Sequence, residues 1–183
     1  IYSELTYDQH HLSIASFLKE KTIVINGLSK SHSMTGWRIG FLFAPKDITK
    51  HILKVHQYNV SCANSIAQKA ALAALTTGMD DAIPMKREYI QRRDYVYNRL
   101  TAMGLSVVKP DGAFYFFVKI PESIPVNSFD FALEMVHQAK VAVVPGSAFS
   151  EFGEGYFRLS FACSLETLEI GLNRMEQFLN NRL

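Results

Sequence analysis

The chain has 183 residues, a formal net charge of +2 at pH 7, 48% hydrophobic residues and 20% charged residues. This is the balance of an ordinary globular protein, and so small a net charge argues against a nucleic-acid-binding surface. No apolar run reaches the length of a membrane-spanning helix, and the N-terminus lacks the pattern of a signal peptide. We therefore expect neither a nucleic-acid partner nor a membrane partner.

The two cysteines predict reduced thiols. Cys62 and Cys163 lie far apart in the sequence and form neither a disulfide framework nor a metal-ligand spacing. The six histidines show no ligand spacing either, so we expect no metal site. Free thiols of this kind are typical of a cytoplasmic protein.

The first part of the chain combines two short strands with several helices. The expected elements are strands over residues 22–26 and 38–43 and helices over residues 46–57, 65–77 and 80–103. The charge density of the last helix predicts that one face, including Arg92 and Arg93, lies in water. Because two strands make a poor core, we expect residues 1–78 to be the remainder of a larger sheet domain.

The second part alternates strands and helices, which predicts an α/β arrangement over residues 79–183. The expected strands cover residues 105–109, 113–119, 141–144 and 156–161. One helix is expected over residues 128–139, and a final helix is expected to begin after Ser164, which caps it. Phe129, Leu133 and Val136 predict the buried stripe of the first of these helices. The stripe expected on the final helix is Leu168, Leu172, Met175 and Leu179.

The most informative segment is VINGLSKSHSMTGWRIG, residues 24–40. A strand ends in small residues just before Lys30, and a lysine packed near a pocket is placed to lose its proton and attack a carbonyl. Arg38 follows, and its planar guanidinium is suited to hold a phosphate through two parallel hydrogen bonds. An amine nucleophile with a phosphate clamp is what pyridoxal phosphate requires. On position alone, a solvated surface lysine is the competing interpretation.

Residues 29–40 resemble the lysine signature of the class I and II aminotransferases, which are fold type I pyridoxal-phosphate enzymes. Lys30, the run Met-Thr-Gly-Trp-Arg ending at Arg38, and Gly40 are in register with the family pattern. The resemblance implies that Lys30 binds pyridoxal 5'-phosphate and is the catalytic base and acid, and that Arg38 binds the cofactor phosphate. Gly27 stands where many relatives have a phosphate-binding serine, so Ser29 is expected to supply a hydroxyl instead.

A second resemblance covers residues 141–162, where a Pro-Gly turn, a glycine-rich loop and an Arg-x-Ser strand follow one another as in the family's C-terminal pattern. Along that strand Phe157, Leu159 and Phe161 alternate toward one face, which leaves Arg158 on the other face. On its position alone, the favoured interpretation of Arg158 is an exposed arginine on a strand, with no role in binding. By the family match, Arg158 binds the α-carboxylate of the substrate.

Two weaker matches complete the resemblance. Tyr2 corresponds to the family tyrosine that hydrogen-bonds the ring oxygen of the cofactor. The aspartate that precedes it in the family, together with the residues that stack on the ring, is expected upstream of residue 1. The run Gly-Ala-Phe-Tyr, residues 112–115, is similar to a hairpin of the family's small domain, and packing is the expected role of its aromatic side chains.

The resemblance implies an α/β fold in which residues 1–78 are the end of a large-domain sheet of a pyridoxal-phosphate transferase. Residues 79–183 are then an interdomain helix and a complete α/β small domain. The implied activity is amino transfer between amino-acid and 2-oxo-acid substrates, in a homodimer when full length, as in bacterial enzymes for aromatic, aspartate or N-acetyl-diaminopimelate substrates. This chain alone is expected to be inactive.

Two other functions remain open at this point. A carbon–sulfur lyase on the same scaffold would release ammonia and pyruvate, whereas a transaminase needs a 2-oxo-acid acceptor. A non-catalytic aminotransferase-like sensing domain of a transcriptional regulator would need a DNA-binding region, which residues 1–183 do not show.

Overall fold

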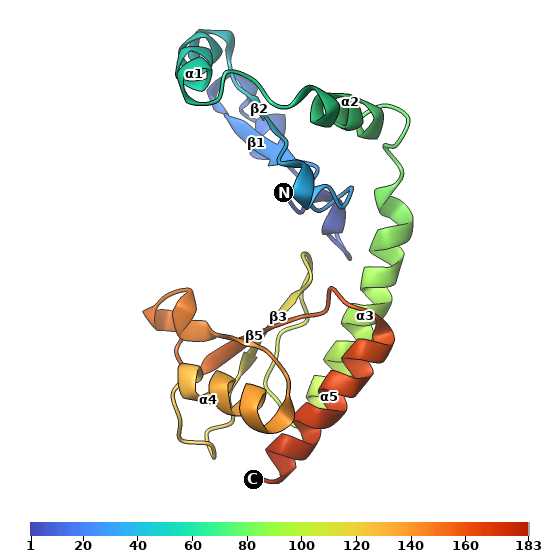
Figure 1. The fold of residues 1–183 in the computed structure, drawn as a ribbon, viewed down its shortest axis with the longest axis vertical. Coiled ribbons are helices and arrows are strands. Elements are labelled where there is room, and N and C mark those ends of the chain that lie inside the picture. The colour runs from blue at the N-terminus through green and yellow to red at the C-terminus, as the bar shows by residue number, and fades with distance from the viewer. Residues whose placement is uncertain (183) are drawn as a thin grey trace. The chain divides into compact units, whose positions relative to one another are not determined.

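The computed structural model describes residues 1–182 and divides into two units. The first is Ile1–Lys86 and the second begins at Arg87, so the boundary falls inside the long helix α3 (Ala82–Ala102), which is green in Figure 1. Among residues 1–182, the helices are all too short or too polar to cross a membrane.

The first unit is built on an antiparallel pair of strands. β1 (Val24–Gly27) and β2 (Gly40–Phe43) pair so that Val24 lies opposite Phe43 and Gly27 opposite Gly40. The helices α1 (Lys46–Asn59) and α2 (Ser65–Ala74) follow, where the predicted helices begin. The short 3-10 turns of this unit are η1 (Ser3–Leu5), η2 (Ile14–Ser16), η3 (Lys19–Lys21) and η4 (Thr35–Trp37).

The second strand begins two residues later than predicted. Arg38 ends η4 with φ +52°, in the left-handed region, so the extended backbone starts only at Gly40. A non-glycine residue rarely adopts this conformation, and it cannot continue a strand. The prediction of a strand over residues 38–43 is therefore wrong at its start.

A buried cluster of the first unit contains Leu28, Met34, Ala71 and Ala74, with Ile39, Phe41 and Ala70 packed against it. Helix α1 has no buried residue, and the side chain of Ile25 on β1 is 76% exposed. The part of the chain that the structure describes therefore leaves much of the apolar surface of α1 and β1 uncovered.

The second unit contains a three-stranded antiparallel sheet in the order β3–β5–β4. The strands are β3 (Tyr115–Lys119), β4 (Val144–Pro145) and β5 (Tyr156–Ser160). The helices are α4 (Ser128–Glu134), which continues as the π-helical turn η5 (Met135–Ala139), and α5 (Leu165–Asn180). Two 3-10 turns, η6 (Gly146–Ala148) and η7 (Glu151–Gly153), separate β4 from β5. The mixed α/β class is confirmed, although the strand pairs are antiparallel.

Helices α3 and α5 run side by side in this unit (Figure 1). Arg99 on α3 joins them, because Nη2 donates to Asn173 Oδ1 at 2.7 Å and to Glu176 Oε2 at 3.1 Å on α5. The apolar stripe predicted for α5 is confirmed, since its four members are all buried.

Helix α4 buries a different face from the predicted one. Phe129, Leu133 and Val136 are 58%, 42% and 40% exposed, whereas the buried residues include Phe131 and Met135. The ring of Phe131 stacks on Phe157 of β5 and meets Phe178 of α5 edge-on. The predicted stripe is wrong because α4 carries two apolar faces, and only the face that includes Phe131 packs against the sheet and α5.

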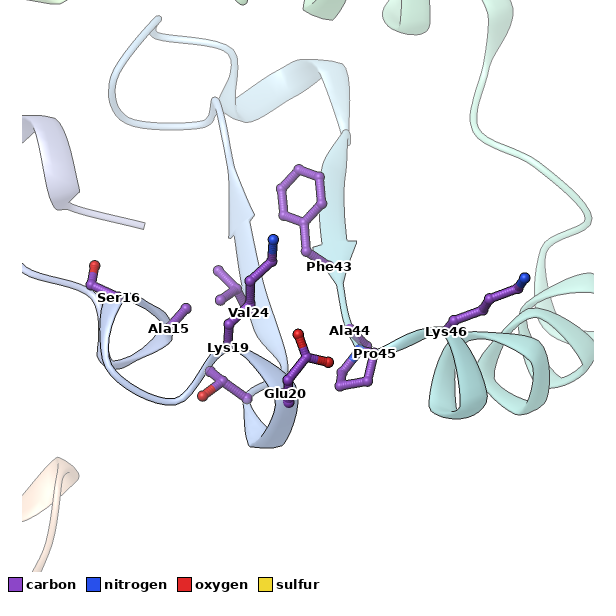
Figure 2. A pocket seen from close by; sticks show the side chains of 10 residues that line it. Ala15, Ser16, Lys19, Glu20, Val24, Phe43, Ala44, Pro45 and Lys46 are labelled. Carbon is purple, nitrogen blue, oxygen red and sulfur yellow. The ribbon is translucent and has the colours of Figure 1, made fainter.

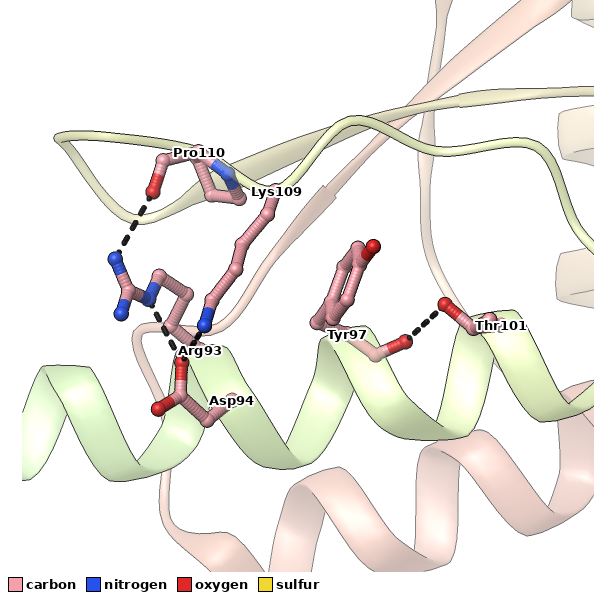
Figure 3. A network of polar contacts seen from close by, with 6 residues as sticks. All are labelled: Arg93, Asp94, Tyr97, Thr101, Lys109 and Pro110. Atoms are coloured by element: carbon pink, nitrogen blue, oxygen red, sulfur yellow. Dashed lines mark hydrogen bonds and ion pairs between the residues drawn. The ribbon is translucent and has the colours of Figure 1, made fainter.

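The segment after α3 is also not a strand. Residues 105–109 were expected to be extended and paired, but only an isolated bridge between Val107 and Val118 of β3 forms there. What holds this segment is a set of polar contacts from α3 (Figure 3). Arg93 donates from Nε to Asp94 Oδ1 at 2.9 Å and from Nη1 to the Pro110 carbonyl at 3.3 Å. Lys109 Nζ pairs with the same Asp94 oxygen at 2.9 Å.

Arg93 is only 2% exposed, so the prediction that it lies in water is wrong. Burying a guanidinium is tolerated because its donors are satisfied by a carboxylate and a carbonyl. Partial burial raises the pKa of the Asp94 carboxyl, but hydrogen bonds from Lys109 and Arg93 outweigh it and hold this pKa below its ordinary value.

Asp94→Asn is expected to lower the free energy of unfolding by about 1–2 kcal/mol at neutral pH, a figure discounted because Asp94 is partly exposed. Since the folded pKa is depressed, this stabilisation is complete above the unfolded pKa of about 3.9 and is lost as the pH falls through the folded value. Urea unfolding should show a clear deficit near pH ~7 and a smaller one near pH ~3, because the stabilisation decreases as the pH falls below the unfolded pKa. Equal deficits at both pH values would contradict the assignment.

Candidate functional site

Lys30 lies in a turn of residues 28–34 that is anchored at both ends. Leu28 and Met34 are 3% and 6% exposed, and both belong to the core of the first unit. The backbone N–H groups of His32 and Met34 donate to the Leu28 carbonyl at 3.1 and 3.3 Å. The turn thus holds Lys30, which is half-buried, between two side chains fixed in the core.

The same turn is fastened to helix α2 and the residues that follow it. Ala71 and Ala74 are small enough for Leu28 and Met34 to pack closely against the helix. His32 adds a polar contact, because Nε2 lies 2.9 Å from the Gly78 carbonyl and Nδ1 lies 2.8 Å from the hydroxyl of Ser31. A carbonyl only accepts, so Nε2 carries the proton in this arrangement.

Thr35 links the turn to Arg38. Its hydroxyl donates to the carbonyl of Ser29 at 2.7 Å, and its own carbonyl accepts from Arg38 Nη1 at 2.8 Å. Ser29, Lys30 and Arg38 are therefore held by one continuous folded segment. The exposed guanidinium of Arg38 makes no other hydrogen bond or ion pair within residues 1–182, so its remaining donors are available.

Arg38 lines a surface cavity of about 640 Å³. The cavity is lined by Gly36, Trp37, Arg38, Gly40, His56, Val60, Cys62, Ala63, Asn64, Ile66 and Ala67. This volume is in the range of small-molecule sites. Of the predicted site residues, Arg38 lines this cavity, whereas Tyr2, Ser29 and Lys30 do not. The amine, guanidinium and serine hydroxyl carried by residues 29–38 have the donor chemistry that an aldehyde with a phosphate group needs, so in chemical type they fit pyridoxal phosphate.

The N-terminal segment lies against the end of β1. Asn26 Nδ2 lies 3.5 Å from Ser3 Oγ. Tyr2 precedes Ser3 in the chain, so its backbone lies near the end of the strand that leads to Lys30. A Cβ at position 27 would lie 3.1 Å from the Ile39 carbonyl oxygen, so a side chain there would be tightly packed against the neighbouring strand.

Arg158 lies on β5 in the second unit, opposite Phe117 of β3 and Val144 of β4. Its neighbours Phe157 and Leu159 are 0% and 7% exposed, so the predicted alternation is confirmed and Arg158 is on the face away from the core. Its side chain is half-buried. The structure thus groups Tyr2, Ser29, Lys30 and Arg38 in the first unit and places Arg158 in the second.

The loop before β5 is held by contacts that link distant residues. Glu154 Oε1 accepts from the backbone N–H of Ser128 at 2.6 Å and of Gly155 at 2.9 Å, and Oε2 accepts from the Ser128 hydroxyl at 3.0 Å. The backbone hydrogen bonds from Ser128 and Gly155 lower the pKa of Glu154. Ser128 also hydrogen-bonds Ser147 at 2.9 Å, while the side chain of Asn127 caps α4.

Sequence reasoning missed Thr35 and Glu154. Thr35 is part of the signature, but nothing in its neighbours shows that it connects Ser29 with Arg38. Glu154 contacts Ser128 across 26 positions, a separation at which the sequence carries no local signal. Thr35 hydrogen-bonds Ser29 and Arg38, and Glu154 holds the loop that precedes the strand of Arg158.

A second surface cavity, of about 580 Å³, lies beside the strand pair (Figure 2). It is lined by Ala15, Ser16, Lys19, Glu20, Thr22, Val24, Phe43, Ala44, Pro45 and Lys46. None of the predicted site residues lines it. Among residues 1–182, no group of three or more His, Cys, Asp or Glu side chains is arranged to hold a metal ion.

Residues 1–175 match the sequence profile of the family described as Aminotransferase class I and II. The chain belongs to this family. The two segments identified above as resembling aminotransferase motifs both lie inside the matched range.

Several class I and II aminotransferases are similar over essentially the whole chain. A Bacillus subtilis (strain 168) protein described as a probable N-acetyl-LL-diaminopimelate aminotransferase is 68% identical over 178 residues, which are 97% of this chain and 45% of that protein. The aspartate aminotransferase of Pyrococcus abyssi is 44% identical over 187 residues, covering 100% of this chain and 48% of the enzyme.

Solved aminotransferase structures have the same fold as this chain. The aromatic aminotransferase from Pyrococcus horikoshii OT3 has a TM-score of 0.93 at 44% identity and covers 100% of this chain and 50% of its own. The aspartate aminotransferase from Thermus thermophilus with maleate has a TM-score of 0.90 at 36% identity, over 97% and 46% of the two chains. The chain thus spans about half the length of the aminotransferases that it matches.

Proposed function

We propose that the protein containing this chain is a pyridoxal-phosphate-dependent aminotransferase that moves an amino group from an amino acid to a 2-oxo acid. The observation that carries this proposal is the anchored turn of residues 28–34, in which Ser29, the residue before Lys30, is hydrogen-bonded through Thr35 to Arg38. The family membership supports it. When bound, pyridoxal phosphate supplies an electron sink for the negative charge that develops at the substrate Cα.

Each site residue then has one task. Lys30 binds the cofactor aldehyde and moves a proton to and from the substrate Cα as general base and acid. Arg38 binds the phosphate with the donors that Thr35 leaves available, and Ser29 adds a hydroxyl. Tyr2 hydrogen-bonds the ring oxygen of the cofactor, and Arg158 orients the substrate by its α-carboxylate.

We further propose that residues 1–78 are the C-terminal part of a large cofactor-binding domain and residues 79–183 an interdomain helix with a small domain. A cytoplasmic homodimer is the expected state of the full-length protein. The name of the 68% identical relative makes N-acetyl-LL-diaminopimelate the first amino-group donor to test, with a 2-oxo acid as the acceptor.

The test is chemical labelling of Lys30. The intact protein is incubated with pyridoxal phosphate, reduced with borohydride and mapped by peptide mass spectrometry. Borohydride converts the carbon–nitrogen double bond of a lysine-bound aldehyde into a stable single bond, so a phosphopyridoxyl group is expected on Lys30. Labelling of Lys50 or other exposed lysines to the same extent, or no labelling of the full-length protein, would overturn the proposal.

A further inference from the structure

The guanidinium of Arg158 lies against two aromatic rings of the second unit. Its Cζ is 4.3 Å from the ring centroid of Tyr115, on β3, and 4.7 Å from that of Phe149, at the end of η6. Both distances are well inside the range of cation–π attraction. The sequence assigned only packing to the aromatic side chains of residues 112–115, so the contact of Tyr115 with Arg158 is new information from the structure.

The charge of Arg158 is not neutralised by an acidic side chain. Within residues 1–182, Arg158 forms no ion pair and no hydrogen bond through its guanidinium. Glu154 lies only four positions earlier, but its two oxygens accept hydrogen bonds from Ser128 and Gly155 instead. The carboxylate of Glu154 is therefore bonded to the start of α4, and no carboxylate of the described residues pairs with Arg158.

Aromatic rings attract a cation over their faces, whereas a carboxylate binds the N–H groups at the edge of a guanidinium. We propose that Tyr115 and Phe149 are positioning residues that orient the Arg158 guanidinium, so that its edge stays open to the α-carboxylate of the substrate. This inference rests on the proposed function, because the carboxylate role of Arg158 comes from that proposal. It adds two residues and a physical reason for the orientation of the arginine.

The second ring is itself supported by other side chains. Phe149 meets Phe117 edge-on at a centroid distance of 6.1 Å, and Phe117 stacks on Tyr156 at 5.1 Å. Phe117 is also the residue opposite Arg158 in the strand register. The arginine and its aromatic neighbours thus form one continuous surface on the face of the sheet away from the core. A ring that is already held in place by its neighbours loses less conformational entropy when the substrate binds than a mobile ring does.

The test compares variants that remove a ring with variants that retain one. Phe149→Leu and Tyr115→Leu remove the ring face, while Phe149→Tyr and Tyr115→Phe retain it. Phe152→Leu is the matched control, because Phe152 belongs to the same loop and is 86% exposed. Phe149 is itself 51% exposed, so its replacement opens no buried cavity.

Two quantities are measured on the full-length protein: the Kd of the unreactive dicarboxylate maleate by calorimetry, and kcat and KM for amino transfer. We expect each ring-removing variant to raise the maleate Kd and the substrate KM about fivefold, with kcat changed by less than about twofold. The ring-retaining variants and Phe152→Leu should stay within about twofold of the unaltered protein in both quantities.

The outcomes separate this inference from the proposed function. Unchanged Kd and KM in Phe149→Leu and Tyr115→Leu, in a protein that transfers amino groups, would overturn the positioning role alone. A protein that transfers no amino group but binds maleate in a ring-dependent way would overturn the proposed function and retain the carboxylate site. Failure of the unaltered protein to bind maleate would overturn the positioning role.

Discussion

Lys30→Ala is expected to lower kcat for amino transfer by at least about a thousandfold. In the proposed function the amine both attaches the cofactor and moves the proton at the substrate Cα, and general acid–base catalysis alone contributes about a hundredfold to ten-thousandfold. The fold should remain intact, because the turn is anchored by Leu28 and Met34 and not by the lysine side chain. The measurement is steady-state amino transfer from N-acetyl-LL-diaminopimelate to a 2-oxo acid.

Two variants sharpen this result. Lys30→Arg retains a positive charge but presents a group that stays protonated, so it should be as inactive as Lys30→Ala. Lys50→Ala is the matched control, because Lys50 forms only an exposed ion pair with Asp47, and such pairs contribute little. If Lys30→Ala kept more than about a tenth of the activity, Lys30 would not be the catalytic lysine. Ammonia and pyruvate in place of amino transfer would identify a lyase.

Gly146→Ala is expected to lower the free energy of unfolding by about 3 kcal/mol. A Cβ at this position would lie 1.9 Å from the carbonyl oxygen of Gly153 and 2.8 Å from that of Tyr156, and neither backbone atom can rotate away. The loop would have to move as a whole. Since that loop carries Phe149 and leads into the strand of Arg158, substrate binding should weaken as well.

The controls use the same kind of substitution. Gly153→Ala should be equally harmful, because its Cβ would lie 2.1 Å from the Gly146 carbonyl oxygen. Gly171→Ala should instead be stabilising by about 1 kcal/mol, since Gly171 is inside α5 and has open space around it. Chemical denaturation of the three variants measures these differences. A Gly146→Ala protein as stable as the unaltered chain would show that the two glycines are not in contact.

The predictions that succeeded depend on patterns within one element. Alternation along β5 correctly placed Phe157 and Leu159 in the core and Arg158 on the other face, because a strand has only two faces. The stripe of α5 was correct for a similar reason, since only one face of that helix is strongly apolar. The run of residues from Lys30 to Arg38 was recognisable because its chemistry is concentrated in one segment of sequence.

The predictions that failed depend on partners far away in the chain. On α4, Phe129 and Phe131 are equally apolar, and only the packing of Phe131 against Phe157 and Phe178 decides which face is buried. Arg93 is charged and lies in a charged helix, yet the carbonyl of Pro110 and the carboxylate of Asp94 allow its burial. The contact of Tyr115 with Arg158 spans 43 positions of sequence and likewise required the fold.

The backbone of Arg38 shows a conflict between stability and chemistry. Its φ of +52° costs about 1 kcal/mol for an arginine and almost nothing for glycine. Selection for stability alone would therefore favour glycine at this position. A guanidinium is present in its place, at the edge of the 640 Å³ cavity, so the cost in folding free energy is consistent with a functional role for the cation. A version of this protein redesigned only for thermal stability would be expected to lose that residue first, and with it the phosphate contact proposed above.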